Sequence, residues 1–154
     1  MALAVGDPVP DFSLSTDAGG TFSADDLRGT RTILYFYPKD DTPGCTKEAH
    51  AFRDRIEVFR AAGVAVVGVS ADPVASHDRF KAKHALNFPL ISDPDKTLAQ
   101  IFGVWVEKSM YGKKYMGIER ASFLIDEAGV VREIWRKVKV PGHADAVLAA
   151  AKAL

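Results

Sequence analysis

The sequence predicts an α/β fold in which helices flank a mixed central sheet. Two nearly continuous apolar runs, 32–37 and 64–70, are typical of strands covered on both faces. Helical spacing follows each run, so the two strands are expected to be parallel and joined by helical crossovers. Nearer the carboxyl end, the turn-rich residues 126–129 join the strand-like runs 121–125 and 130–135 into an antiparallel hairpin.

The N-terminal third of the chain predicts a small hairpin, a central strand and a helix. Strand-like segments 12–14 and 21–23 flank the turn-rich Asp17–Gly20. After the strand 32–37, a helix is expected to begin at Cys45 and to end at Gly63. Its apolar residues recur at helical spacing: Ala49, Phe52, Ile56 and Phe59.

The rest of the chain continues the alternation of strands and helices. We expect a helix over about 74–85, a short strand over 88–91 and a helix over 96–102. The alanine-rich segment 144–154 predicts a closing helix. Parallel crossovers beside an antiparallel edge hairpin favour a thioredoxin-like fold with an N-terminal hairpin extension. A flavodoxin-like order is the alternative, but no glycine-rich phosphate loop follows any strand.

Length and charge narrow the class of protein. The 154 residues fit one domain spanning 1–154. The 20 Lys and Arg residues balance 20 Asp and Glu residues, so no global charge favours nucleic acid or anionic lipid. Asp7 interrupts the N-terminal segment before a signal-type apolar stretch forms, and no segment approaches membrane-spanning length. We therefore expect a cytoplasmic protein with neither nucleic acid nor membrane as a partner.

Cys45 is the single cysteine of the sequence and lies where a strand-like run gives way to a helix. A thiol in the first turn of a helix faces free backbone N–H groups and the positive end of the helix dipole, and both favour the thiolate. Lone cysteines are otherwise most often small buried apolar residues. With one cysteine, no internal disulfide forms, which suits a reducing compartment.

No metal or cofactor is expected. The four histidines lack the spacing of a zinc site. Three lysines near residue 110 indicate a solvated basic loop: Lys108, Lys113 and Lys114. Large side chains in the same region either border a pocket for an organic substrate or, for most of the aromatic ones, only close the core: Trp105, Tyr111, Tyr115 and Met116.

The residues around Cys45 carry a specific resemblance. Pro38-x-x-x-Thr42-x-x-Cys45 resembles the active-site motif of the peroxiredoxins, which are thiol peroxidases on a thioredoxin fold. The longer string 35–49 is similar to that of the bacterioferritin comigratory protein, or peroxiredoxin Q, group, and the resemblance continues through 88–93, 117–126 and 138–143. It implies reduction of hydrogen peroxide and organic hydroperoxides, with Cys45 as the peroxidatic residue assisted by Thr42 and Arg120.

Ionisation of Cys45 alone does not account for the rate of an enzyme, so further groups must assist the reaction. Ionising a thiol fully gains little more than about tenfold in reactive species, or about 1.4 kcal/mol, whereas enzymes commonly lower barriers by at least roughly 8 kcal/mol. Breaking a peroxide O–O bond places negative charge on the departing oxygen, so fixed hydrogen-bond donors are needed. The hydroxyl of Thr42 can donate to peroxide or thiolate while it accepts from a loop amide, and the same residue can also cap the helix. Arg120 supplies a permanent cation with several donors, although the spacing alone does not distinguish it from other arginines.

Three further residues are candidates for support. Pro38 shields the thiolate from water or simply ends a strand. Glu48 either holds the fork of Arg120 or is a favourable acidic residue in the first turn of the helix. Gly44 either allows a close backbone approach and offers an N–H to an anion pocket, or relieves crowding at the start of the helix.

The sequence departs from the family pattern at His50. Many members of the group carry a resolving cysteine at this position, so here the Cys45 sulfenic acid needs an external thiol, from thioredoxin, from glutaredoxin with glutathione, or from another small thiol. His50 itself is expected to be a packing or surface residue, because five positions along a helix place it off the face of Cys45. The resemblance favours a monomer.

Two other functions are alternatives to a thiol peroxidase. One is a cysteine hydrolase, which needs a histidine beside Cys45, and the other is a noncatalytic redox sensor.

Overall fold

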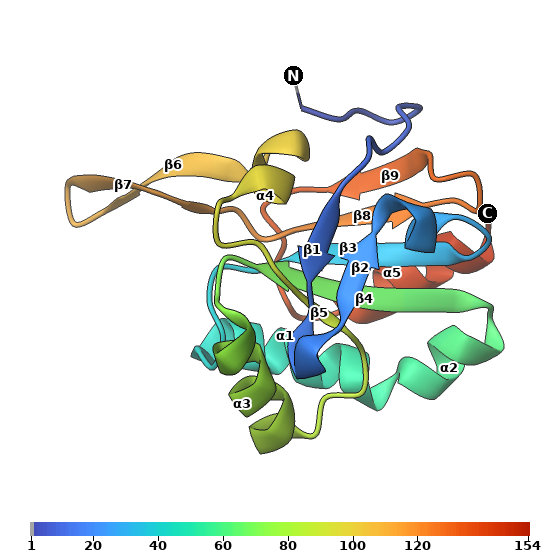
Figure 1. The fold of residues 1–154 in the computed structure, drawn as a ribbon, viewed down its shortest axis with the longest axis horizontal. Coiled ribbons are helices and arrows are strands. Elements are labelled where there is room, and N and C mark those ends of the chain that lie inside the picture. Colours follow the sequence, from blue (N-terminus) through green and yellow to red (C-terminus); the bar gives the residue numbers. More distant parts are fainter. Residues whose placement is uncertain (1) are drawn as a thin grey trace.

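A five-stranded mixed sheet forms the centre of the computed structural model, which describes residues 2–154. Its strands lie in the order β5-β4-β3-β8-β9 (Figure 1). Strands β3, β4 and β5 are parallel, whereas β8 is antiparallel to both β3 and β9. The strands are β3 Arg31–Phe36, β4 Val64–Ser70, β5 Leu90–Ser92, β8 Ala121–Ile125 and β9 Val131–Trp135. The expected mixed α/β sheet is therefore confirmed.

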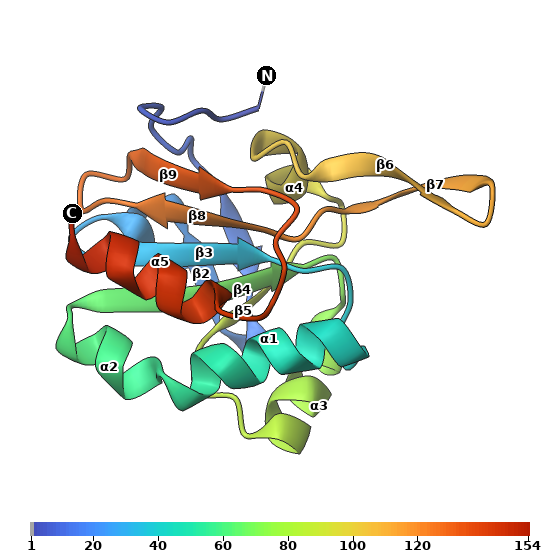
Figure 2. The ribbon, with the colours of Figure 1, turned by 180° about the vertical axis from the view of Figure 1, so that it is seen from behind.

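Five α-helices surround this sheet. They are α1 Pro43–Asp54, α2 Ile56–Ala61, α3 Val74–His84, α4 Thr97–Ile101 and α5 His143–Lys152. Figure 2 shows α1 and α5 in front of the sheet, side by side. Within the described residues, no helix combines the length and the apolar character that crossing a membrane requires.

Two apolar clusters cover opposite faces of the sheet, because successive residues of a strand point to opposite sides. On β3, Ile33 and Tyr35 belong to the cluster that includes α1, α2 and α5. Leu34 and Phe36 belong to the other cluster, which also contains Leu98 of α4. Strand β3 is thus buried on both faces. Packing on both sides fixes the end of this strand, which is where the loop to Cys45 begins.

The N-terminal hairpin is also present. β1 (Ser13–Ser15) pairs with β2 (Thr21–Ser23), and the 3₁₀ turns Asp17–Gly19 and Ala24–Leu27 follow the two strands. The hairpin is tied to the edge of the central sheet, because the Leu90 amide donates to Asp17 Oδ1 at 2.9 Å. A β-bridge between Thr16 and Ile91 strengthens this attachment.

Two boundaries differ from those expected. The helix predicted from Cys45 to Gly63 is broken at Arg55 (φ −110°, ψ 5°), which separates α1 from α2. The Arg55 guanidinium donates to the Ala51 carbonyl at 2.9 Å and pairs with Asp145 of α5, so a tertiary contact holds the break. The strand predicted over 88–91 begins later, because Pro89 has no N–H for the ladder.

The segment predicted as a solvated basic loop is a second hairpin. β6 (Trp105–Met110) pairs antiparallel with β7 (Lys113–Ile118) and projects from the body of the molecule (Figure 1). Tyr111 (φ 51°) and Gly112 (φ 78°) form its two-residue turn, the left-handed geometry that suits a twisted hairpin. The prediction of a loop was wrong, because both faces of these two strands are largely exposed and the sequence therefore lacks the alternation that marks a half-buried strand.

The large side chains of this hairpin do not close the core. Tyr111 is 98% exposed, Tyr115 44% and Met116 49%. Only Trp105, at the base of the hairpin, packs against one of the two apolar clusters. The expectation that most of these aromatic residues fill the core was therefore wrong for the two tyrosines.

Candidate active site

Cys45 lies in the first turn of α1, after the loop that leaves β3. Pro43 occupies the first helical position, and the first helical hydrogen bond runs from the Thr46 amide to the Thr42 carbonyl at 2.8 Å. The amides of Gly44 and Cys45 precede that bond and have no partner within the helix. They provide N–H donors and partial positive charge around a thiol that is only 2% exposed.

The register of the sheet brings Arg120 to the same place. Phe36, the last residue of β3, pairs with Ala121, the first residue of β8. Arg120 therefore lies at the end of β3 from which the loop to Cys45 departs. Its Nη2 donates to Cys45 Sγ at 3.3 Å, and its Nη1 donates to Glu48 Oε1 at 2.6 Å. One guanidinium thus links the thiol to a carboxylate on the next turn of α1.

Glu48 is buried and only half satisfied. It is 1% exposed, and while Oε1 accepts from Arg120, Oε2 has no hydrogen-bond partner among the described residues. Burial raises the pKa of Glu48 to about 7, against the opposing effect of Arg120. The pKa of Arg120 itself is raised: burial opposes this, but Glu48 and Cys45 both favour the charged guanidinium. The ion pair therefore forms fully only when Glu48 loses its proton near neutral pH.

Gly44 makes room for the guanidinium. A Cβ atom at this position would lie 3.1 Å from Arg120 Nη2 and 3.9 Å from Cζ. That nitrogen is held by Cys45 and its neighbour by Glu48, so the guanidinium has little freedom to move aside. A side chain at Gly44 would therefore crowd Arg120, and the Gly44 amide at the start of the helix is left without a helical partner.

Thr42 occupies the N-cap position of α1 without using its side chain as a cap. Its hydroxyl donates instead to the Lys39 carbonyl at 2.8 Å, within the loop. The proton of this hydroxyl is thus already engaged, and the lone pairs of Oγ1 are left to accept a hydrogen bond from a bound molecule. This polarity is the reverse of the expected one, in which Thr42 donates to the peroxide and accepts from a loop amide.

A buried network that sequence reasoning missed holds the loop. Asp40, 7% exposed, accepts hydrogen bonds from Tyr37 at 2.6 Å, Ser76 at 2.8 Å and His77 at 2.7 Å. The Asp40 amide donates to Asp72 at 2.8 Å. The pKa of His77 is raised, because its bonds to Asp40 and a backbone carbonyl outweigh burial. The only sequence signal was an acidic residue between two loop prolines, which also suits a solvated turn.

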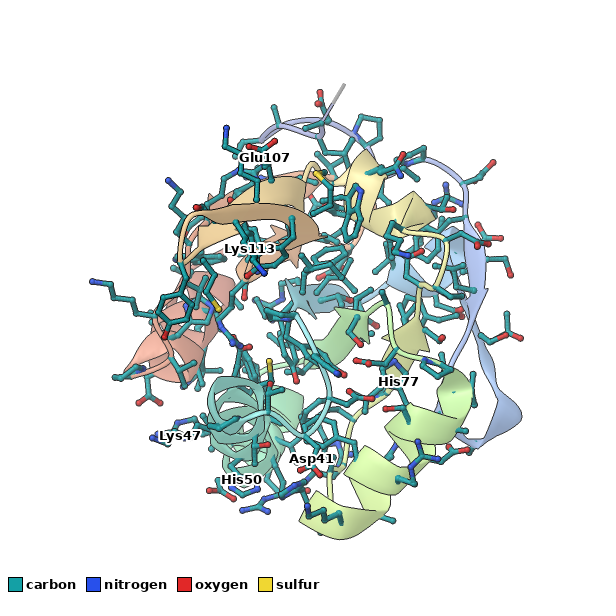
Figure 3. The ribbon with its side chains drawn as sticks, turned by 90° about the vertical axis from the view of Figure 1, so that its left-hand side faces the viewer. Asp41, Lys47, His50, His77, Glu107 and Lys113 are labelled. Atoms are coloured by element: carbon teal, nitrogen blue, oxygen red, sulfur yellow. The ribbon has the colours of Figure 1, made fainter. Side chains whose placement is uncertain are left out.

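Other contacts hold the loop from its exposed side. Asp41 has left-handed backbone (φ 58°) and binds Lys83 at 2.7 Å and His84 at 2.9 Å on α3. His84 in turn lies 3.0 Å from His50 of α1, so His50 is a packing residue, as expected. Figure 3 shows Asp41, in the loop, and His50 on the same side of the molecule. Pro38 is half buried at the start of the same loop.

The histidines make bonds elsewhere than at Cys45. Across residues 2–154, the side-chain hydrogen bond to Cys45 Sγ comes from Arg120. His77 bonds to Asp40, and His143 lies 2.7 Å from Ser122. The geometry gives no support to a cysteine hydrolase, which needs an imidazole beside the thiol. Within the same described residues, no group of three His, Cys, Asp or Glu side chains is placed to hold a metal ion.

Fold and site together define a thiol peroxidase on a thioredoxin-like fold. Residues 5–134 match the sequence pattern of the AhpC/TSA family. The putative peroxiredoxin bcp of Coxiella burnetii is 55% identical over 93% of this chain and 95% of its own. Peroxiredoxin Bcp of Bacillus subtilis is 48% identical over 93% of this chain and 91% of its own. A solved structure of the Xanthomonas campestris bacterioferritin comigratory protein, studied for its alkyl peroxide reduction activity, is 48% identical with a TM-score of 0.91, covering 98% of this chain and 96% of that one.

These similarities establish the family. The chain belongs to the AhpC/TSA family and is similar throughout to its Bcp, or peroxiredoxin Q, members. It is therefore a peroxidase that uses thiols, and its single cysteine is consistent with a one-cysteine mechanism.

Proposed function

We propose that Cys45, Thr42 and Arg120 are the catalytic residues of this peroxidase and that Pro38, Gly44 and Glu48 support them. The observation that carries the proposal is the hydrogen bond from Arg120 Nη2 to Cys45 Sγ at 3.3 Å. It joins a permanent cation to the sulfur at a helix N-terminus, the arrangement that stabilises negative charge on both sulfur and a departing oxygen.

The reaction begins with attack of the Cys45 thiolate on one peroxide oxygen. An S–O bond forms while the O–O bond breaks, and sulfur loses two electrons. The second oxygen takes up the proton that the attacked oxygen carried and departs as water or alcohol, which leaves Cys45 as the sulfenate. Arg120 and the free amides of Gly44 and Cys45 stabilise the charge on the departing oxygen. Thr42 Oγ1, whose own proton is engaged with the Lys39 carbonyl, accepts a hydrogen bond from the peroxide O–H and so orients the substrate.

An external thiol completes the cycle, because Cys45 is the single cysteine of the sequence. A first thiol attacks the sulfenic sulfur, water leaves, and a mixed disulfide forms. A second thiol attacks that disulfide and restores the Cys45 thiolate. Thioredoxin, glutaredoxin with glutathione, and small thiols all provide this chemistry.

Consumption of hydrogen peroxide with dithiothreitol as reductant tests the proposal. Wild-type protein is expected to turn over, and Cys45→Ser is expected to lose turnover completely while keeping its fold by circular dichroism. Fast formation of sulfenic acid without turnover would instead indicate a redox sensor. Inertness towards peroxide would overturn the peroxidase assignment.

We further propose that the chain acts as one domain and as a monomer in the cytoplasm. The two apolar clusters share one sheet, and a single cysteine suits a reducing compartment. Light scattering on reduced and oxidised protein gives the oligomeric state, and cell fractionation gives the compartment. A dimer that persists under reducing conditions would contradict the monomer.

A further inference from the structure

Lys108, on β6 of the projecting hairpin, is a partly buried cation without a carboxylate partner. The residues on either side of it, Glu107 and Ser109, are exposed, whereas Lys108 is half buried. No carboxylate among residues 2–154 forms an ion pair with Lys108, although Lys114 on the same hairpin pairs with Glu107 at 3.7 Å. A partly desolvated charge without a partner is unfavourable, so its position requires a reason.

The hairpin turns Lys108 towards the side on which Cys45 lies. In the register of β6 and β7, Lys108 is opposite Tyr115, and Lys113 is opposite Met110. Side chains of paired residues and of residues two apart share one face of a hairpin, so Lys108 and Lys113 lie on the same face. Figure 3 shows Lys113 on the side of the hairpin that faces α1, and Glu107 on the opposite side.

Gly117 directs the side chain of Lys108 to the base of the hairpin. A Cβ atom at Gly117 would lie 3.2 Å from Lys108 Cδ and 3.4 Å from Cε. Gly117 is two residues closer to β8 than Tyr115, the partner of Lys108 in the register. The aliphatic part of the Lys108 side chain therefore crosses β7 at Gly117, which has no side chain. It extends towards the residues that precede β8, among which is Arg120.

The charges around the thiol act on the Lys108 ammonium. Its pKa is lowered by burial and by the charge of Arg120, whereas Cys45 and Glu119 act in the opposite direction. Glu119 is engaged elsewhere, since it accepts from the Lys137 amide at 3.3 Å and lies 3.6 Å from Arg136. Arg120 uses both amino groups on Glu48 and Cys45. Among residues 2–154, Lys108 forms no side-chain hydrogen bond or ion pair, so its ammonium donors remain free.

We propose that Lys108, on the face of the hairpin that turns towards α1, is a carboxylate-binding subsite for Cys45 chemistry, which favours reaction partners that carry a carboxylate near their reacting group. The inference rests on the proposed peroxidase function and names one class of partner for it. The carboxylate belongs either to the hydroperoxide or to the reducing thiol. In either case it accepts the same charge-assisted hydrogen bond from the ammonium. Lys108 does not take part in bond breaking; it determines specificity.

The reductive arm of the test compares two small thiols of similar size, 3-mercaptopropionate and 2-mercaptoethanol. Preformed Cys45 sulfenic acid is reduced by each, and the rates are expressed per thiolate. Wild-type protein is expected to favour the carboxylate by about fivefold at low salt, the range of a partly screened ion pair. Added salt lowers this preference, because it screens the charges.

The oxidative arm compares a short-chain hydroperoxy acid, whose carboxylate lies near the hydroperoxide, with its methyl ester. The two differ only in the charged group, so their ratio of oxidation rates isolates carboxylate recognition. A preference in this arm assigns the carboxylate to the peroxide, and a preference in the thiol arm assigns it to the reductant.

Variants connect the preference to this residue. Lys108→Met is expected to abolish it, Lys108→Arg to keep it, and Gly117→Ala to weaken it by displacing the lysine stem. Lys113→Met, on the same face, is the matched control and is expected to change neither ratio. Equal rates for charged and neutral partners in both arms of the wild-type test, or an equal loss for all partners in Lys108→Met, would overturn the subsite. Hydrogen peroxide turnover with dithiothreitol separates this outcome from failure of the peroxidase function itself.

Discussion

Arg120 Nη2 lies 3.3 Å from Cys45 Sγ, although the two residues are 75 positions apart in the sequence. The connection between the parallel strands β3 and β4 contains the loop and the helix that carry the thiol. The antiparallel strand β8 pairs with β3 and places the arginine beside them. The thiol therefore meets its cation only when the central sheet is assembled. This relationship yields the first of five predictions.

Replacement of Arg120 by Ala is expected to slow sulfenic acid formation by about a hundredfold, even where Cys45 is fully ionised, because it removes a donor to the departing oxygen. Stopped-flow fluorescence with hydrogen peroxide at high pH measures the rate. Recovery of the wild-type rate at saturating pH would show that Arg120 acts only through the ionisation of Cys45.

Glu48→Gln is expected to lower the oxidation rate by about tenfold, since the bond to Arg120 loses its charge. Burial raises the pKa of Glu48 to about 7, so in the wild type the ion pair is lost as pH falls below neutrality. The wild-type rate should therefore fall more steeply with acid than the thiolate fraction, which ultraviolet absorbance follows. In Glu48→Gln the rate should track the thiolate fraction alone. Identical pH profiles would contradict this role.

Gly44→Ala is expected to reduce the oxidation rate by about tenfold without loss of stability. The new Cβ would lie 3.1 Å from Arg120 Nη2 and displaces the guanidinium. Alanine at a helical position is otherwise more favourable than glycine by up to about 1 kcal/mol, so the melting temperature should be unchanged or higher. In an Arg120→Ala background the same substitution should have no further effect on the rate. A full additional loss there would show that Gly44 acts on the substrate directly.

Excess peroxide is expected to oxidise Cys45 beyond the sulfenic acid when reductant is absent, because the sequence contains no second cysteine to trap it. Intact-mass measurement should show the addition of two and then three oxygen atoms. Cys45→Ser is the control for oxidation at methionine. A mass that stops at one added oxygen would mean that the protein protects its sulfenic acid.

Acid is expected to destabilise the protein through His143, whose pKa burial lowers to about 4. The unfolded histidine takes up a proton near pH 6.5, whereas the folded one does not until about pH 4, so this contribution to stability is lost as pH falls through that range. His143→Gln should lose less unfolding free energy between pH 7.5 and pH 5 than the wild type, by on the order of 1 kcal/mol after allowance for solvent screening. Urea unfolding at both pH values measures it. Equal losses would assign the acid sensitivity to other groups.

Much of the fold was predictable because its signals are local. The apolar runs of β3 and β4 and the turn at 126–129 depend on near neighbours, so strand type and the C-terminal hairpin follow from composition and spacing. The break at Arg55 did not, since Asp145, on another helix, helps to hold it. The β6–β7 hairpin also escaped prediction, because strands with exposed residues on both faces lack the alternation that marks a half-buried strand.

The sequence by itself determined the chemistry of the thiol: one cysteine, placed after a strand and in the first turn of a helix, with Thr42 and Gly44 beside it. Only the tertiary structure decided which distant groups reach that thiol. Arg120 comes from the register of β8, and His77 of α3 holds Asp40 of the loop that leads to the thiol. Lys108 lies against Gly117 on a hairpin that the sequence indicated only as basic. The physical reason is that helix dipoles and caps act within a few residues, whereas a guanidinium or an ammonium is positioned by strand pairing between segments far apart in the chain.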